Sequence, residues 1–297
     1  TGWEGTAPAF GYGAAELYNK TYNTYQKVAN APNGVYAINL QAYYRAGWCT
    51  QSYANYNNNN ANALAKLYAV SANDTVQSSI MNIFADARDS RIGTGSEKNE
   101  KGSNTDETGV AFVPDNMQAA AAYFEEGRYA KNTVFFGTDN HEFLVGLIKT
   151  TTLDGDWTMF DNWKLTYDGN SAAAYQKWQD QAMTDAFDTS TLPEGTLVTV
   201  GTIEAYNTLK STLAAPTCKA DVIANIKKVT DAANALLANV EAWKAYKAAY
   251  DAAGATIADE DVADGELKES LGDLQWAAED DLNSLTLTTE EVVEKTN

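Results

Sequence analysis

The sequence has few cysteines, one histidine and no long hydrophobic run. Its two cysteines, Cys49 and Cys218, form neither a dense disulfide framework nor a metal-binding spacing. A single bridge between them would have to join two domains, and we do not expect one. No run of about 18 apolar residues is present, so we expect no membrane-spanning helix in this chain.

The sequence also lacks the common catalytic motifs. It contains no GxSxG elbow, no HExxH zinc helix, no P-loop and no dinucleotide fingerprint. The single histidine, His141, follows Asp139 and Asn140 in a predicted tight turn, where a structural role is expected. A carboxylate pair for glycoside hydrolysis is defined only by its separation in space, so the sequence leaves that chemistry open. Because these motifs are missing, we expect this chain not to be an enzyme, and the full-length protein stays open.

Basic residues are scarce. The chain has 21 Lys and Arg against 40 Asp and Glu, a net charge of -19. Phosphate backbones and anionic lipid surfaces repel such a protein, so we expect no nucleic-acid partner.

Aromatic residues and glycines are concentrated before Gly169 and are sparse after it. At 297 residues the chain exceeds the usual size of about 100 to 200 residues for one domain. We therefore predict two domains, at residues 1–169 and 170–297.

The first domain has the pattern of short strands separated by turns. It contains one exception, the Ala-rich segment 115–126, which is typical of a short surface helix. These features predict an all-β jelly-roll sandwich with one inserted helix. The expected strands are 21–28, 35–45, 65–70, 76–85, 131–137, 142–148 and 157–167.

The second domain changes to the period of about 3.6 residues that is typical of helices. Long apolar stripes occupy residues 222–250 and 267–285, and shorter ones lie around 175–182 and 203–213. We predict an acidic, all-α helical bundle of three to five helices. Thr288 and Glu291 are spaced as a capping box close to the end of the chain at Asn297. The abrupt start and this late helix signal suggest a fragment, truncated at its C-terminus, of a longer protein whose leader is missing.

Strand order places the loops. If consecutive strands run antiparallel, the tight turns 29–34, 71–75 and 137–141 share one end of the sandwich. The long connections 46–63, 86–130 and 149–156 then share the other end, where recognition usually occurs on a rigid scaffold.

The first long connection combines Trp48, Tyr53 and Tyr56 with amides such as Asn57, and Arg88 begins the second. A pyranose stacks one apolar face on an aromatic ring and needs directional partners for its hydroxyls. These five residues are therefore the predicted sugar-binding set. The alternatives are that the Asn run is a flexible tip, that the aromatics cover the core, and that Arg88 forms a structural ion pair.

The last predicted strand contains one polar residue in an apolar row. Strict alternation puts Asp161 on the same face as Trp157, Met159 and Trp163. A buried carboxylate needs a partner.

The stretch PDNMQAAAAYFEEGRYAKNTVFF, then FLVGLIKTTTLDGDWTMFDNWKLTYDG, together with PNGVYAINLQAYYRAG upstream, resembles a galactose-binding-like β-sandwich module of exported and cell-surface Bacteroidota proteins. The resemblance implies carbohydrate recognition without catalysis, a secreted or cell-surface location, and Asp161 as a candidate ligand of a structural Ca²⁺. A hydrogen bond from loop backbone to Asp161 is the alternative. The helical part resembles spacer modules of similar exported proteins.

Three functions follow from this. The first is non-catalytic glycan binding by the sandwich, with the helical part as spacer or interaction module. The second is an adhesion or assembly protein that binds other surface proteins. The third is the accessory region of a larger glycoside hydrolase.

Overall fold

The computed structural model describes residues 2–60, 62–262 and 264–296, and the chain forms two compact units. The first unit is Thr1–Trp178 and the second is Gln179–Asn297. The division therefore falls beyond the end of the last strand at Gly169. Lys177, just before the division, pairs with Asp168 at 2.7 Å and lies 5.5 Å from the centroid of the Phe135 ring, which holds this part of the chain to the first unit.

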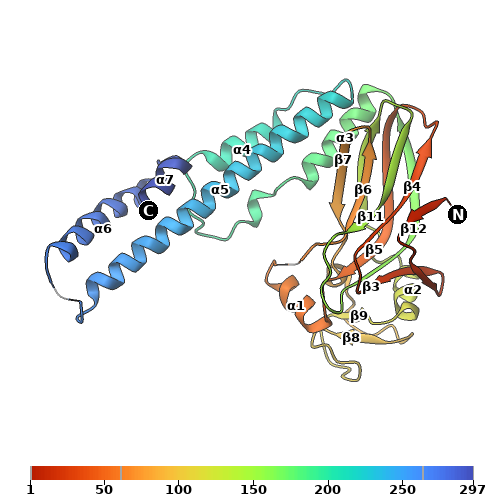
Figure 1. The fold of residues 1–297 in the computed structure, drawn as a ribbon, viewed down its shortest axis with the longest axis horizontal. Coiled ribbons are helices and arrows are strands. Elements are labelled where there is room, and N and C mark those ends of the chain that lie inside the picture. The colour runs from red at the N-terminus through yellow and green to blue at the C-terminus, as the bar shows by residue number, and fades with distance from the viewer. Residues whose placement is uncertain (1, 61, 263, 297) are drawn as a thin grey trace. The chain divides into compact units, whose positions relative to one another are not determined.

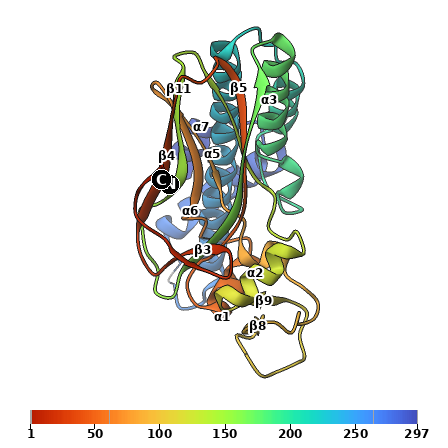
Figure 2. The same ribbon diagram turned by 90° about the vertical axis from the view of Figure 1, so that its right-hand side faces the viewer.

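The first unit contains two five-stranded antiparallel sheets (Figures 1 and 2). One sheet has the strand order β1 (Trp3–Gly5), β4 (Tyr22–Ala29), β11 (Glu142–Lys149), β6 (Lys66–Ser71) and β7 (Asp74–Ser79). The other has the order β10 (Asn132–Thr138), β5 (Gly34–Arg45), β12 (Trp157–Gly169), β3 (Ala14–Tyr18) and β2 (Ala9–Gly11). A two-stranded ribbon, β8 (Glu97–Asn99) and β9 (Phe112–Pro114), is separate. The β-sandwich and the helical region after it are confirmed, and jelly-roll connectivity stays a prediction.

Apolar side chains from both sheets meet between them. Alternate residues of β5 face this core, as do residues of β6, β10 and β11. A second cluster lies on the other face of β5 and β12, where Tyr43 and Met159 pack with Tyr123 and Phe124 of helix α2 (Met117–Glu125). The Asn116 side chain caps α2 by accepting a hydrogen bond from the Ala119 N–H at 2.9 Å. The inserted helix predicted over 115–126 is thus confirmed.

One predicted strand is shorter than expected. β7 ends at Ser79, and the end of the segment predicted over 76–85 lies in a 3₁₀ turn, η1 (Ile83–Asp86). Asn82 caps this turn by accepting from the Phe84 N–H at 2.8 Å, and that local bond ends the extended chain. The structure also contains β1, β2 and β3, and a helix α1 (Cys49–Asn57) within the first long connection.

The predicted arrangement of loops is confirmed. The Ala31 N–H donates to the His141 carbonyl at 2.9 Å, and Ser71 Oγ donates to Asn140 Oδ1 at 3.3 Å, so the three tight turns adjoin. At the other end Trp157 lies opposite Arg45, and Lys149 lies opposite Tyr22. Figures 1 and 2 show α1, α2, β8 and β9 gathered at this long-connection end.

The prediction that side chains alternate strictly along β12 is wrong. Asp161 lies opposite Gln41 and Lys164 opposite Asn39, so β12 contains one extra residue between them. This β-bulge has Asn162 in the left-handed region, at φ 53°, which Asn tolerates better than most residues. The extra residue reverses the faces, and Trp163 packs against the inter-sheet core together with Phe160.

The second unit consists of helices. Part of α3 (Ala172–Asp185) is followed by the short 3₁₀ turn η2 (Thr189–Thr191), α4 (Thr202–Ser211), α5 (Lys219–Ala258), α6 (Glu266–Ser284) and α7 (Thr289–Thr296). The capping box is confirmed: Thr288 N–H donates to the Glu291 carboxylate at 2.8 Å, and Glu291 N–H donates to Thr288 Oγ1 at 3.3 Å. Across the described parts of the chain, no helix is long and apolar enough to cross a bilayer.

The two cysteines are free thiols in different environments. Cys49 is buried, and burial raises the pKa of its thiol to about 11. Cys218 is exposed. Because the thiolate is the reactive form, we expect Ellman's reagent at pH 8 to modify Cys218 in the native protein and Cys49 only after denaturation. Rapid modification of both thiols in the native state would contradict this arrangement.

Candidate functional site

Trp48 stands at the long-connection end, directly before α1, with 51% of its surface exposed. Its Nε1–H donates to Asp154 Oδ2 at 3.0 Å. A methyl group added to Gly155 would lie 2.7 Å from ring carbon Cδ2, so the indole packs on the bare backbone of this glycine. The ring is therefore fixed by the third long connection.

Tyr53 and Tyr56 lie on α1 and pack against Phe84. Their ring centroids are 5.0 Å and 6.3 Å from that of Phe84. Tyr53 is half-buried against the α2 cluster, whereas Tyr56 and Asn57 are exposed. The segment expected as a loop is thus helical up to Asn57, and the Asn run that follows begins where the helix ends.

Arg88 is held by protein groups. Its NH1 donates to both carboxylate oxygens of Glu126, and its Nε–H donates to the Ser90 carbonyl at 3.0 Å. This is the structural ion pair that the sequence left open. The structure thus brings the predicted residues to one end of the sandwich, where Trp48, Tyr53 and Arg88 contact different partners. Trp48, Tyr56 and Asn57 are the members with exposed surface.

A second site lies where β1 and β2 are the outermost strands of the two sheets. A cavity of about 510 Å³ opens there, and we call it the edge cleft. Its walls come from β1 and β4 of one sheet and from β2, β3 and β12 of the other. The lining residues are Trp3, Glu4, Gly5, Thr6, Ala7, Pro8, Phe10, Gly13, Ala14, Ala15, Thr24, Phe160, Asp161 and Trp163.

Aromatic rings form one part of the edge cleft. The centroid of the Trp163 ring lies 4.7 Å from that of Trp3, with 51° between the planes, and 6.2 Å from that of Phe160. Phe10 is 79% exposed. The bulge at Asn162 places Trp163 in this cluster, since unbroken alternation would have directed it to the opposite face. The cleft thus contains two tryptophan rings held by neighbouring rings and one exposed phenylalanine ring.

Two carboxylates form the polar part of the edge cleft. Glu4 is held at the surface by Lys27 Nζ at 3.2 Å and by the Tyr25 hydroxyl at 3.3 Å. Asp161 is half-buried, and within the described residues its carboxylate makes no hydrogen bond or ion pair. A half-buried carboxylate without a protein partner can accept hydrogen bonds from a ligand.

The sequence marks Asp161 as the charged member of an apolar row, but it does not mark the edge cleft around it. Trp3 and Phe10 belong to strands of three residues, too short for an alternating pattern. The signal that could have found them is an aromatic pair around the turn residues Gly5 and Pro8.

The predicted calcium site at Asp161 stays a prediction. Among the residues that the structure describes, no three or more His, Cys, Asp or Glu side chains are grouped to hold a metal ion. Ca²⁺ takes about six to eight oxygen ligands, and Asp161 offers it a single side-chain carboxylate in the edge cleft. The side-chain donors at Asp161 do not by themselves fit the ion.

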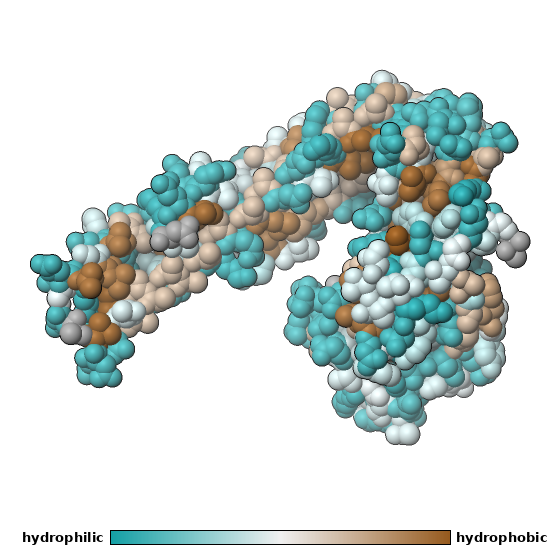
Figure 3. Space-filling view, viewed as in Figure 1, coloured by the Kyte–Doolittle hydropathy of each residue, from teal (hydrophilic) through white to brown (hydrophobic). Residues whose placement is uncertain are grey.

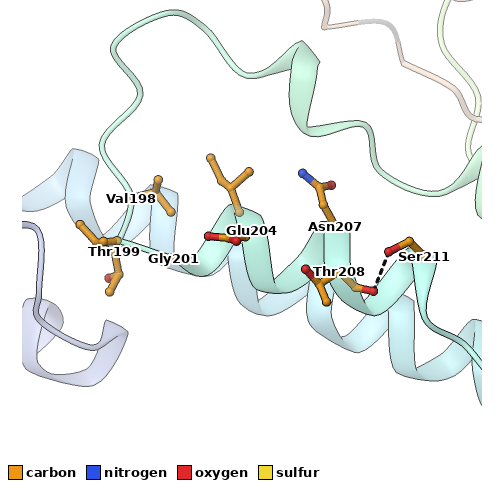
Figure 4. Close-up of a pocket in the computed structure, with 9 residues that line it drawn as sticks. Val198, Thr199, Gly201, Glu204, Asn207, Thr208 and Ser211 are labelled. Atoms are coloured by element: carbon orange, nitrogen blue, oxygen red, sulfur yellow. Dashed lines mark hydrogen bonds between the residues drawn. The ribbon is translucent and has the colours of Figure 1, made fainter.

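The helical unit has an open groove along α4, of about 610 Å³. Figure 4 shows its lining side chains on α4 and on the segment 198–201 directly before it, with the chain that precedes Val198 arching over them. Ser211 Oγ donates to the Thr208 carbonyl within the helix. No aromatic ring lines this groove within the described residues, and Glu204 is its one acidic member. The edge cleft therefore has the more specific chemistry.

No protein-family model and no curated protein matches the chain. Among solved structures, the carbohydrate-binding module TmCBM61 in complex with β-1,4-galactotriose shows a likeness with a TM-score of 0.24 and 10% identity. The likeness covers 52% of this chain and 70% of that one.

Proposed function

We propose that the sandwich binds a carbohydrate in the edge cleft without catalysing a reaction on it. The observation that carries this proposal is that the exposed ring of Phe10 and the packed ring of Trp163 line the same cleft as Asp161. The carboxylate of Asp161 has no protein partner among the described residues. A sugar ring has apolar C–H faces that stack on aromatic rings, and hydroxyls that donate to a carboxylate. The helical unit acts as a spacer or interaction module of an exported surface protein.

Glu4 favours binding over hydrolysis. Glycoside hydrolysis needs two carboxyl groups that flank the scissile bond, one of them protonated at the start. Glu4 is the second carboxylate of the edge cleft, and its Oε2 is paired with Lys27 Nζ at 3.2 Å. Of the two carboxylates that line this cleft, one is thus already engaged by a protein cation, which favours binding over hydrolysis.

Phe10→Ala tests the edge cleft directly. A screen of polysaccharides with the whole chain identifies the tightest ligand, and calorimetry compares its affinity for the variants. We expect Phe10→Ala to weaken binding about tenfold, equivalent to ~1.4 kcal/mol of lost stacking. Tyr12→Ala is the matched control, because Tyr12 is a similarly exposed aromatic two residues away that does not line the cleft. Equal loss in both variants, or binding to no polysaccharide, would reject the proposal.

A chelator separates the two roles of Asp161. If the carboxylate contacts the sugar directly, binding in EDTA should equal binding in added Ca²⁺. A loss of affinity in EDTA that Ca²⁺ restores would instead support the predicted calcium site.

A protein-binding function for the helical unit is favoured by α6. Its side chains Leu267, Leu274 and Trp276 are 89%, 68% and 70% exposed, and Figure 3 shows hydrophobic patches over this part of the unit. Apolar surface of this kind marks interaction sites. A photo-crosslinker at position 276, applied in the native extract, should give one discrete adduct. An adduct pattern identical to that of a crosslinker at the polar position 269 would contradict this function.

A further inference from the structure

We propose that the edge cleft selects uncharged carbohydrates and that Asp161 excludes anionic ones. This inference rests on the proposed function and names the class of its ligand. The charge of one carboxylate, and not only the shape of the cleft, then decides between neutral and acidic sugars.

The charges that line the edge cleft have one sign. Glu4 and Asp161 are acidic, and none of the described lining residues is Lys, Arg or His. Lys27 is the cation bound to Glu4, and it lies outside the lining. A uronic acid or a sulfated sugar would therefore bring its charge beside the unpartnered carboxylate of Asp161, with no cation among the lining residues to pair with it. Like charges in a partly desolvated site repel strongly.

The fold holds Asp161 in this position. Asp161 is the last residue before the bulge, opposite Gln41 of β5. The Asn162 side chain donates to Gln41 Oε1 at 2.7 Å, and Gln41 itself donates to the Phe124 and Arg128 carbonyls at 2.8 Å and 2.7 Å. This chain of hydrogen bonds fixes the bulge to α2, so the carboxylate is preorganised before any ligand arrives.

Asp161 has unused acceptor capacity that a neutral sugar can fill. A carboxylate has two oxygens and about four lone-pair sites. Adjacent hydroxyls of a pyranose can donate to both oxygens, as two N–H groups of arginine do elsewhere. A neutral ligand thus satisfies the half-buried charge, whereas an anionic ligand adds a second charge beside it.

The net charge of -19 also repels polyanions, but over a longer range. Salt at about 0.5 M screens exposed charges within a few ångströms and screens partly buried pairs much less. Discrimination that survives this salt concentration therefore arises within the cleft.

The test uses one polysaccharide in two forms. The tightest neutral ligand from the screen is compared with the same polymer after oxidation of its C6 hydroxymethyl groups to carboxylates, at about 0.5 M salt. We expect the wild-type protein to bind the neutral form at least ~tenfold more tightly. In Asp161→Asn the preference should fall below ~threefold, while affinity for the neutral form drops several-fold.

Glu142→Gln is the matched control, because it removes one exposed negative charge outside the cleft and should leave the preference unchanged. Equal wild-type affinity for the two forms, or an unchanged preference in Asp161→Asn, would overturn the inference while the proposed function stands. Binding to neither form would reject the proposed function and this inference with it. If Asp161→Asn fails to fold, Asp161→Ser takes its place, and the wild-type preference still decides the first part.

Discussion

Replacing Lys149 by Met should lower the free energy of unfolding of the sandwich by about 3–5 kcal/mol. Lys149 and Asp156 form an ion pair with both side chains fully buried at the long-connection end. Burial lowers the pKa of Lys149, while its hydrogen bond to Asp156 opposes that shift. Removing the lysine leaves the Asp156 carboxylate buried beside the rings of Tyr22 and Tyr44 without its counter-charge. The urea midpoint, followed by tryptophan fluorescence, measures the loss.

Two controls isolate the unpaired charge as the cause. The double variant Lys149→Met with Asp156→Asn removes both charges, and Asn retains an oxygen that can accept from the Leu153 N–H, as Asp156 does at 2.9 Å. We expect it to regain much of the lost stability. Lys27→Met disrupts an exposed pair in the same unit and should leave the midpoint nearly unchanged. A double variant less stable than Lys149→Met would contradict this explanation.

Replacing Glu97 by Met should cost about 3 kcal/mol and release the connection between η1 and β9. Glu97 is buried and accepts hydrogen bonds from the Ile92 and Gly93 N–H groups, both at 3.0 Å, and from the Tyr123 hydroxyl at 2.8 Å. Methionine fills a similar volume but leaves two backbone donors without an acceptor. The free energy of unfolding and the rate of tryptic cleavage after Lys98 and Lys101 measure the two effects.

The matched control for this prediction is Glu125→Gln on α2. Glu125 is exposed, and its replacement should change neither the stability nor the cleavage rate. Glu97→Gln keeps one acceptor oxygen and should lose less than Glu97→Met. If Glu97→Met were as stable and as resistant to trypsin as the wild type, the buried carboxylate would not organise this connection.

Local pattern explains which parts of the fold the sequence could predict. Seven strands and α2 follow from alternation, turn residues and an N-cap, each of which spans a few neighbouring residues. The arrangement of loops at two ends follows from antiparallel order alone. β1, β2 and β3 were missed because strands of three to five residues carry too little alternation to be recognised.

The edge cleft could not be predicted because it combines distant segments. Trp3 and Trp163 are brought together only when β1 joins β4 and β12 bulges at Asn162. Nothing in the pattern WTMFDNWKLTY distinguishes a bulge from unbroken alternation. Asn162 can occupy an extended strand as well as the left-handed backbone that the bulge requires. The sugar-binding residues predicted at the long connections lie at the expected end of the sandwich. Arg88 and Tyr53, however, contact protein groups that only the folded chain brings to them.

The most direct test of the central claim is a crystal structure of the chain with the oligosaccharide that binds best in the screen. We predict a sugar ring in the edge cleft, in contact with Phe10 or Trp163, with one or more hydroxyls within hydrogen-bond distance of the Asp161 carboxylate. A sugar seated on Trp48 at the long-connection end, with the edge cleft free of ligand, would contradict the assignment of this cleft as the binding site.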